Sequence, residues 1–97
     1  MQAVNKVEII ISTLELNEIL DILNSVRVSG YTVIENIAGK GDRGMSYNDL
    51  DRTSSNSYIM TVCTDKKQLD FLVEEVVKLL KRIGGVCLVT DSNWVVH

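Results

Sequence analysis

The stretch that decides the fold reads Tyr31-Thr32-Val33-Ile34-Glu35-Asn36-Ile37 and then, after one residue, Gly39-Lys40-Gly41-Asp42-Arg43-Gly44. Its first half alternates along the chain and is rich in β-branched residues, which predicts a strand over residues 31–37. Its second half has three glycines in six residues, so the backbone can turn tightly and approach a ligand closely. Exposed N–H groups in such a turn, with the cations Lys40 and Arg43 beside them, suit a phosphate group. The stretch therefore predicts a strand that leads into a phosphate or nucleotide cradle, with a solvated hairpin loop as the alternative.

Before this stretch, the sequence predicts one strand and one helix. Residues 6–12 carry apolar side chains for both faces of a strand, which indicates an interior strand. The sequence Ser12-Thr13-Leu14-Glu15 fits a capping box, so a helix is expected to begin at Ser12 or Thr13. Apolar residues then recur at helical spacing, at Leu16, Ile19, Leu20, Leu23 and Val26. Gly30 is expected to end this helix in a left-handed conformation.

After this stretch, residues 38–57 show no hydrophobic period and are expected to form a long loop without regular structure. A loop of this length within one domain is commonly functional. Residues 58–63 predict a third strand, and Thr64 or Asp65 is expected to cap a second helix.

The end of the chain predicts a fourth strand. Gly84-Gly85 is expected to close the second helix, and residues 86–90 then form the strand. Asp91-Ser92-Asn93 is typical of a turn, after which residues 94–96 could return as a short strand. Trp94 is expected to seal the sheet edge or a subunit contact rather than to stack on a base.

The predicted elements follow the order β-α-β, long loop, β-α-β within a single domain, residues 1–97. This order is that of the α+β, ferredoxin-like βαββαβ fold, in which both helices lie on one face of an antiparallel sheet. The other face of the sheet also carries apolar side chains, among them Ile10 and Ile34, and a monomer rarely exposes a large apolar face. We therefore expect a closed cyclic oligomer, with a homotrimer preferred.

Composition excludes several classes of protein. The net charge of −3 and the scattered basic residues argue against a nucleic-acid partner. No apolar run approaches the roughly 20 residues of a membrane span, and the first residues do not resemble a secretory signal, which predicts a cytoplasmic protein. Cys63 and Cys87 lie in apolar runs and are expected to be buried free thiols, with a disulfide as the alternative. His97 is the only histidine, so no metal site is predicted, and the sequence brings together no catalytic group, so we do not expect an enzyme.

The chain resembles the PII superfamily, cytoplasmic trimers of ferredoxin-like subunits whose T-loop, between the second and third strands, contacts target proteins. Gly30-Tyr31-Thr32-Val33-Ile34 and Gly39-Lys40-Gly41-Asp42-Arg43 carry the resemblance, with the long loop directly after them. Within the superfamily the chain is most similar to the PII-like branch that includes the regulator of the cyanobacterial bicarbonate transporter.

The resemblance implies an adenine-nucleotide site in the cleft between neighbouring subunits. It places the phosphates against the loop base, the nucleoside against the second strand, and the start of the last strand of the adjacent subunit over both. The residues so implied are Gly39, Lys40, Gly41 and Arg43 at the loop base, Thr32 and Val33 on the second strand, and Gly85, Val86, Cys87 and Leu88 on the last strand.

Two departures from the family pattern narrow the expected ligand. The segment between the second helix and the last strand, Arg82-Ile83-Gly84-Gly85, is too short to wrap a triphosphate, although Arg82 could reach one. The loop also lacks the recognisable modification site of nitrogen-regulating PII proteins, although it contains Tyr47. We therefore expect AMP, cyclic AMP or ADP as the effector, with no metal ion.

The resemblance also implies a protein partner that docks on residues 44–57 of the loop 38–57. The partner is expected to be a membrane transporter for bicarbonate or another inorganic ion, which would place the protein at the membrane periphery. The residues expected to meet it are Met45, Tyr47, Asp49, Asp51 and Arg52. The alternative is an interaction module that needs no nucleotide, either an ACT-like amino-acid binder with its site near residues 13–15 or a CutA-like trimer.

Overall fold

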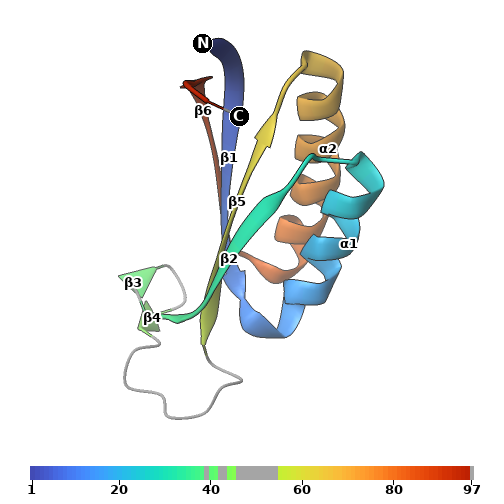
Figure 1. The fold of residues 1–97 in the computed structure, drawn as a ribbon. Coiled ribbons are helices and arrows are strands. Elements are labelled where there is room, and N and C mark those ends of the chain that lie inside the picture. Colours follow the sequence, from blue (N-terminus) through green and yellow to red (C-terminus); the bar gives the residue numbers. More distant parts are fainter. Residues whose placement is uncertain (39, 42–43, 46–54, 97) are drawn as a thin grey trace.

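The computed structural model of the chain describes residues 1–38, 40–41, 44–45 and 55–96. Four strands form one antiparallel sheet in the order β2-β5-β1-β6. Two helices, α1 and α2, lie side by side on one face of this sheet and leave the other face open (Figure 1). The predicted ferredoxin-like fold, with its long connection between the second and third strands of the sheet, is confirmed.

The first strand is central because its neighbours bury it on both sides. Strand β1 (Gln2–Ser12) pairs with β5 (Asn56–Cys63) along one edge and with β6 (Val86–Trp94) along the other. The prediction of an interior strand is therefore confirmed. The strand begins earlier than the apolar run suggests, because the polar residues at its start also pair with β6.

The first helix begins and ends differently from the predicted capping pattern. One 3-10 turn (Thr13–Glu15) precedes α1 (Leu16–Val26), and Ser12 Oγ accepts a hydrogen bond from the N–H of Leu14 at 3.3 Å. The left-handed residue at the end of the helix is Arg27, with φ 64°, so the prediction that Gly30 fills this role is wrong. The helix stops there because its buried stripe ends at Val26, which still contacts the core.

The second strand has the predicted bounds, β2 (Tyr31–Ile37), but its pairing with β5 shifts register between Ile34 and Ile37. Asn36 lies within this irregularity, and its φ of 60° is one that asparagine tolerates better than most residues. Directly after it, β3 (Lys40–Gly41) pairs with β4 (Gly44–Met45) as a small hairpin. The prediction that residues 38–57 lack regular structure is therefore wrong for these four residues and for the start of β5.

The second helix, α2 (Lys66–Ile83), begins as predicted, because the Asp65 carboxylate accepts the N–H of Gln68 at 2.8 Å. Gly84 closes it with φ 81°. The prediction of a turn over residues 91–93 is wrong, since β6 continues without interruption to Trp94. Polar residues are tolerated there because they pair with the polar start of β1.

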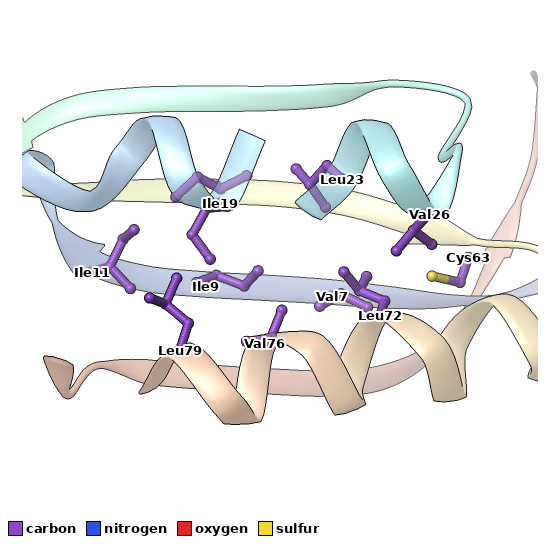
Figure 2. Packing of buried hydrophobic residues seen from close by; sticks show 11 residues of the cluster. Val7, Ile9, Ile11, Ile19, Leu23, Val26, Cys63, Leu72, Val76 and Leu79 are labelled. Carbon is purple, nitrogen blue, oxygen red and sulfur yellow. The ribbon is translucent and has the colours of Figure 1, made fainter. Parts of the chain in front are cut away.

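The core lies between the helices and the covered face of the sheet, and Figure 2 shows side chains from both layers pointing toward one another. Each buried cluster member comes from the inward side of its element, at period 2 in the strands and at helical spacing in the helices. The cluster consists of Val7, Ile9, Ile11, Ile19, Leu23, Val26, Ile59, Cys63, Leu72, Val76 and Leu79. Of the apolar positions predicted for the first helix, Ile19, Leu23 and Val26 are thus confirmed as core residues. Leu16 and Leu20 are partly buried against the same core.

Both cysteines are free thiols, as predicted. Cys63 is fully buried, and Cys87 is half-buried against the core. The two residues do not lie on adjacent strands, because β1 runs between β5 and β6. Burial raises the pKa of the Cys63 thiol from 9.0 to about 11, with a smaller contribution from the negative charge of Asp65.

Candidate functional site

The β3–β4 hairpin lies at the end of the sheet that we call the loop end, where β2 and β1 finish and β5 and β6 begin. The strand register shows this arrangement, since Asn56 pairs with both Ile37 and Ser12, and Val86 pairs with Ile10. Figure 1 shows the hairpin beside the end of β2 and the start of β5. The predicted phosphate segment and the start of the last strand therefore share one end of the sheet.

At this end, the hairpin and the start of β6 nevertheless lie at opposite edges of the sheet. Strand β2 leads into the hairpin at one edge, and β6 begins at the other, with β5 and β1 between them. Three strand spacings separate the edges by about 14 Å. A single chain cannot close these two groups around one small ligand, so a site that uses both must lie between two copies of the chain.

Only part of the predicted phosphate cradle falls within the described residues. Gly39 and Arg43 lie outside them. The backbone of Lys40 and Gly41 is extended and pairs with Gly44–Met45, which engages some of its hydrogen-bonding groups. The prediction that this backbone faces phosphate stays a prediction.

The two predicted residues of the second strand point to opposite faces of the sheet. Thr32 is exposed and stands opposite Met60 on the open face. Val33 stands opposite Ile59 and packs against the buried core. The structure thus gives Val33 a packing role and leaves Thr32 as the residue of this pair that a ligand on the open face would meet.

At the start of the last strand, Gly85 is enclosed by its own chain. A Cβ atom added there would lie 2.7 Å from the carbonyl oxygen of Ile10 and 3.0 Å from a methyl group of Leu80, and the φ of 128° is unfavourable for other residues. Glycine is therefore required here by packing, whatever the ligand. Burial raises the pKa of the Cys87 thiol, which points toward the core. Val86 and Leu88 are exposed on the open face.

The arginine in the last turn of the second helix has a partner within the chain. Arg82 donates a hydrogen bond from Nη2 to Oε2 of Glu18 at 2.7 Å, which links the end of α2 to the start of α1. Both side chains are exposed, so a ligand could compete for the guanidinium. Of the residues predicted to meet a partner protein, Met45 lies in β4, and Tyr47, Asp49, Asp51 and Arg52 lie outside the described residues.

A groove that the sequence did not reveal lies on the open face, at the end of the sheet opposite the hairpin. Its cavity volume is about 230 Å³, and it is open to solvent. Thr32 is one of its lining residues, and the others are Ser29, Gly30, Tyr31, Met60, Thr61, Val62 and Trp94. The period-2 pattern of β5 could have placed Met60 and Val62 on the same face as Thr32, but nothing in the sequence brings Trp94 to them.

The open face also carries one polar cluster among its apolar side chains. Tyr58 donates its hydroxyl proton to Oε2 of Glu8 at 2.6 Å, and Nζ of Lys6 lies 3.7 Å from Oε1 of the same carboxylate. The hydrogen bond to Glu8 raises the pKa of Tyr58, with smaller contributions from desolvation and from the charge of Glu8. Glu8 thus belongs to a network on the open face that links the central strand β1 to β5.

The region near residues 13–15, where an ACT-like site would lie, is occupied by hydroxyl groups that bond to one another. The hydroxyl of Thr13 lies 2.8 Å from that of Ser57 and accepts a hydrogen bond from Ser55 at 3.0 Å. The N–H of Thr13 also donates to the carbonyl of Ser55 at 2.9 Å. This cluster attaches the end of the long loop to the start of the first helix.

The part of the chain that the structure describes contains neither a metal-ligating cluster nor a membrane-spanning helix. No group of three or more His, Cys, Asp or Glu side chains within residues 1–38, 40–41, 44–45 and 55–96 could hold a metal ion. In the same part of the chain, neither helix has the length and apolar character to cross a membrane.

Solved structures similar to this chain include two of CPII from Thiomonas intermedia K12. The one bound to ADP and bicarbonate has a TM-score of 0.80 and 27% identity, over 93% of this chain and 86% of its own. The one bound to ADP, AMP and bicarbonate has a TM-score of 0.78 and 26% identity, over 93% of this chain and 92% of its own. GlnK of B. subtilis, at 18% identity and a TM-score of 0.66 over 95% of this chain and 87% of its own, shares the fold.

Sequence comparison with curated proteins finds no match. The family model described as nitrogen regulatory protein P-II, by contrast, matches residues 4–96. That range includes both segments on which the predicted resemblance rested, and it extends over both helices and all strands of the sheet. The chain therefore belongs to the P-II family of nitrogen regulatory proteins.

Proposed function

We propose that this PII-like signalling protein binds an adenine nucleotide between neighbouring subunits and, through its T-loop, regulates a partner protein. The observation that carries the proposal is the position of Thr32. It lines the groove on the open face, and its strand leads directly into the hairpin that bears Lys40. The proposed nucleotide lies on the open face of β2, with its phosphates toward the loop end.

The related structures support this choice of ligand. CPII, at 26–27% identity, was solved with ADP, with AMP and with bicarbonate. A monophosphate or diphosphate also suits the short connection between α2 and β6, where Gly84 and Gly85 are the only residues between the two elements. Bicarbonate is a second small anion to test beside AMP, cyclic AMP and ADP.

The proposed assembly is a homotrimer in which the open faces of the sheets meet. Ile34 and Leu88 are 52% and 53% exposed on that face, although each belongs to the same sheet as the core. Covering apolar area of this kind stabilises association by about 25 cal/mol per Å². The opposite positions of β2 and β6 fit a closed ring, because the free edge of one copy then faces the other free edge of the next.

The proposed partner is a transporter of bicarbonate or another inorganic ion, met at the membrane periphery by a protein that resides in the cytoplasm. Residues 44–57 form the proposed docking segment. Ligand contacts at the loop base would favour one arrangement of this segment over others, which is a known switching route. No observation on the described residues favours the ACT-like alternative, because the hydroxyls near Thr13 are satisfied by one another.

Isothermal titration calorimetry with AMP, cyclic AMP, ADP and ATP, with and without bicarbonate, tests the proposal. We expect saturable heat with at least one of the first three nucleotides. Arg43→Ala should weaken that binding by roughly 1.5–3 kcal/mol, the contribution of a hydrogen bond to a charged group. Lys67→Ala is the matched control, because it removes one positive charge from α2 at the other end of the sheet. Absence of heat with every nucleotide at millimolar concentration would refute the proposal.

A further inference from the structure

The polar cluster of Lys6, Glu8 and Tyr58 lies on the two interior strands of the sheet, β1 and β5, well inside the open face. On β1, Glu8 stands between Met60 of β5 and Leu88 of β6. Leu88 is an exposed apolar side chain, and the proposed assembly buries it. Any surface that covers the apolar side chains around the cluster therefore covers the cluster as well.

The charged groups of this cluster are incompletely satisfied by their own chain. The Tyr58 hydroxyl donates to Oε2 of Glu8 at 2.6 Å, but Nζ of Lys6 lies 3.7 Å from Oε1, beyond the length of a hydrogen bond. The side chains of Lys6 and Glu8 remain 41% and 24% exposed, so water can reach both charges in the single chain. When another surface covers the open face, that water is lost, and each charge needs a new partner.

The covering surface must therefore bring a hydrogen-bond acceptor for the ammonium group and a donor for the carboxylate. A second copy of the chain brings both, because its own open face carries Glu8 beside Lys6. A purely apolar partner would leave both charges buried without a new contact, which is strongly unfavourable. A partner of one sign of charge would satisfy one of the two groups and repel the other.

We propose that Lys6 of one copy pairs with Glu8 of a neighbouring copy, so that this cluster selects a second copy of the chain as the occupant of the open face. This inference rests on the homotrimer of the proposed function and adds the contact that selects and aligns its subunits. Charged pairs in an interface contribute mainly to the choice of partner and to register. The apolar side chains around them supply most of the energy of association.

Reversal of either charge should dissociate the assembly, because like charges then meet between copies. Lys6→Glu and Glu8→Lys should each raise the protein concentration at which the trimer dissociates about 30-fold or more, the usual effect of breaking a buried charge pair. The chain with both changes again offers one charge of each sign and should recover the mass of the wild type. Lys66→Glu is the matched control, because it reverses a charge in the exposed Lys66–Asp70 pair of α2 and should leave the mass unchanged.

The measurement is sedimentation velocity at several protein concentrations, with circular dichroism to report the fold. Lys6→Met is a milder variant, since it removes the charge and leaves the bond between Tyr58 and Glu8 in place. It should also dissociate the trimer, because it leaves the carboxylate of the neighbouring copy buried without its partner. This variant keeps the test decisive if a charge reversal prevents folding.

The two proposals fail in different ways. A wild-type chain that stays monomeric at every concentration would overturn both the homotrimer and this pairing. Trimers that persist unchanged in folded Lys6→Glu and Lys6→Met would overturn the pairing and leave the homotrimer in place. Dissociation of both single reversals without recovery in the doubly changed chain would show that Lys6 and Glu8 do not pair with each other across the interface. Calorimetry of nucleotide binding tests the ligand part of the proposed function separately from all of these.

Discussion

The two faces of the sheet are built from the same strands, and alternate residues of β1 belong to each. On the covered face, Ile9 is fully buried between the sheet and the helices. One residue later, Ile10 lies on the open face, between Tyr58 and Val86. The covered face is almost entirely apolar, whereas the open face combines apolar residues with the cluster of Lys6, Glu8 and Tyr58. The difference shows that the covered face supplies the hydrophobic core, whereas the open face is the one on which we propose that copies of the chain assemble.

The largest expected effect comes from the covered face. Ile9→Ala should lower the free energy of unfolding by about 2–5 kcal/mol, because it leaves a cavity in a fully packed core. Chemical denaturation at several protein concentrations measures this loss, which should be the same at each. Ile10→Ala is the neighbouring control on the open face. Its cost should be smaller and should depend on protein concentration, since it acts on association. Equal, concentration-independent costs would contradict the division between the faces.

A charge on the open face should separate assembly from folding. Leu88→Asp would place an unpaired carboxylate where the proposed trimer buries apolar surface, so trimers should give way to folded monomers. Sedimentation velocity measures the mass, and circular dichroism reports the fold. Val77→Asp is the matched control, because it places the same charge on an apolar side chain of α2 that is 39% exposed. An unchanged mass for Leu88→Asp, or dissociation of Val77→Asp, would place the interface elsewhere.

The buried thiol of the covered face should make stability depend on alkaline pH. The pKa of Cys63 is about 11 in the fold and 9.0 ordinarily, so the unfolded chain loses this proton first. The stabilisation is complete below pH 9 and decreases as the pH rises toward 11. As the pH rises from about 8 to about 11, the midpoint of chemical denaturation should fall more steeply in the wild type than in Cys63→Ala. Parallel curves for the two proteins would contradict the buried position of the thiol.

The smallest expected effect concerns the polar cluster of the open face. Glu8→Gln removes the negative charge that the Tyr58 hydroxyl faces, and the raised pKa of Tyr58 should therefore fall. The absorbance of tyrosinate during an alkaline titration measures this shift. Glu74→Gln, which removes an exposed carboxylate of α2, is the control and should leave the titration unchanged. If the titration curve of Glu8→Gln were identical to that of the wild type, it would contradict the hydrogen bond between Tyr58 and Glu8.

Much of the fold could be predicted because local patterns and the final structure agree. The alternation in residues 31–37 and the helical spacing from Leu16 to Val26 each reflect one buried side, and the structure buries that side. Predictions were wrong where pairing with a distant strand outweighs local preference. The turn expected at residues 91–93 is strand, because the Nδ2 amide of Asn5, 86 residues away, donates to Asp91 at 3.0 Å.

The candidate site was less predictable from the sequence. A glycine-rich segment beside Lys40 indicates phosphate chemistry, but it does not show that the other predicted site residues lie at the opposite edge of the sheet. The position of Trp94 depends on how far β6 extends, and the sequence pattern ended that strand at Thr90. The sequence alone does not tell whether Gly85 is needed for packing or for ligand binding. The structure shows a packing role, because the carbonyl oxygen of Ile10 leaves no room for a Cβ atom there.

The irregular pairing at Asn36 has a consequence for aggregation. A free sheet edge with an unbroken row of N–H and C=O groups invites a strand from another molecule to add to it. On β2 that row is disturbed between Ile34 and Ile37, which shortens the length over which a foreign strand could pair. The edge formed by β6 has no such shift in its pairing with β1. If the protein is driven to form fibres or swapped dimers, β6 is the edge at which the process should begin.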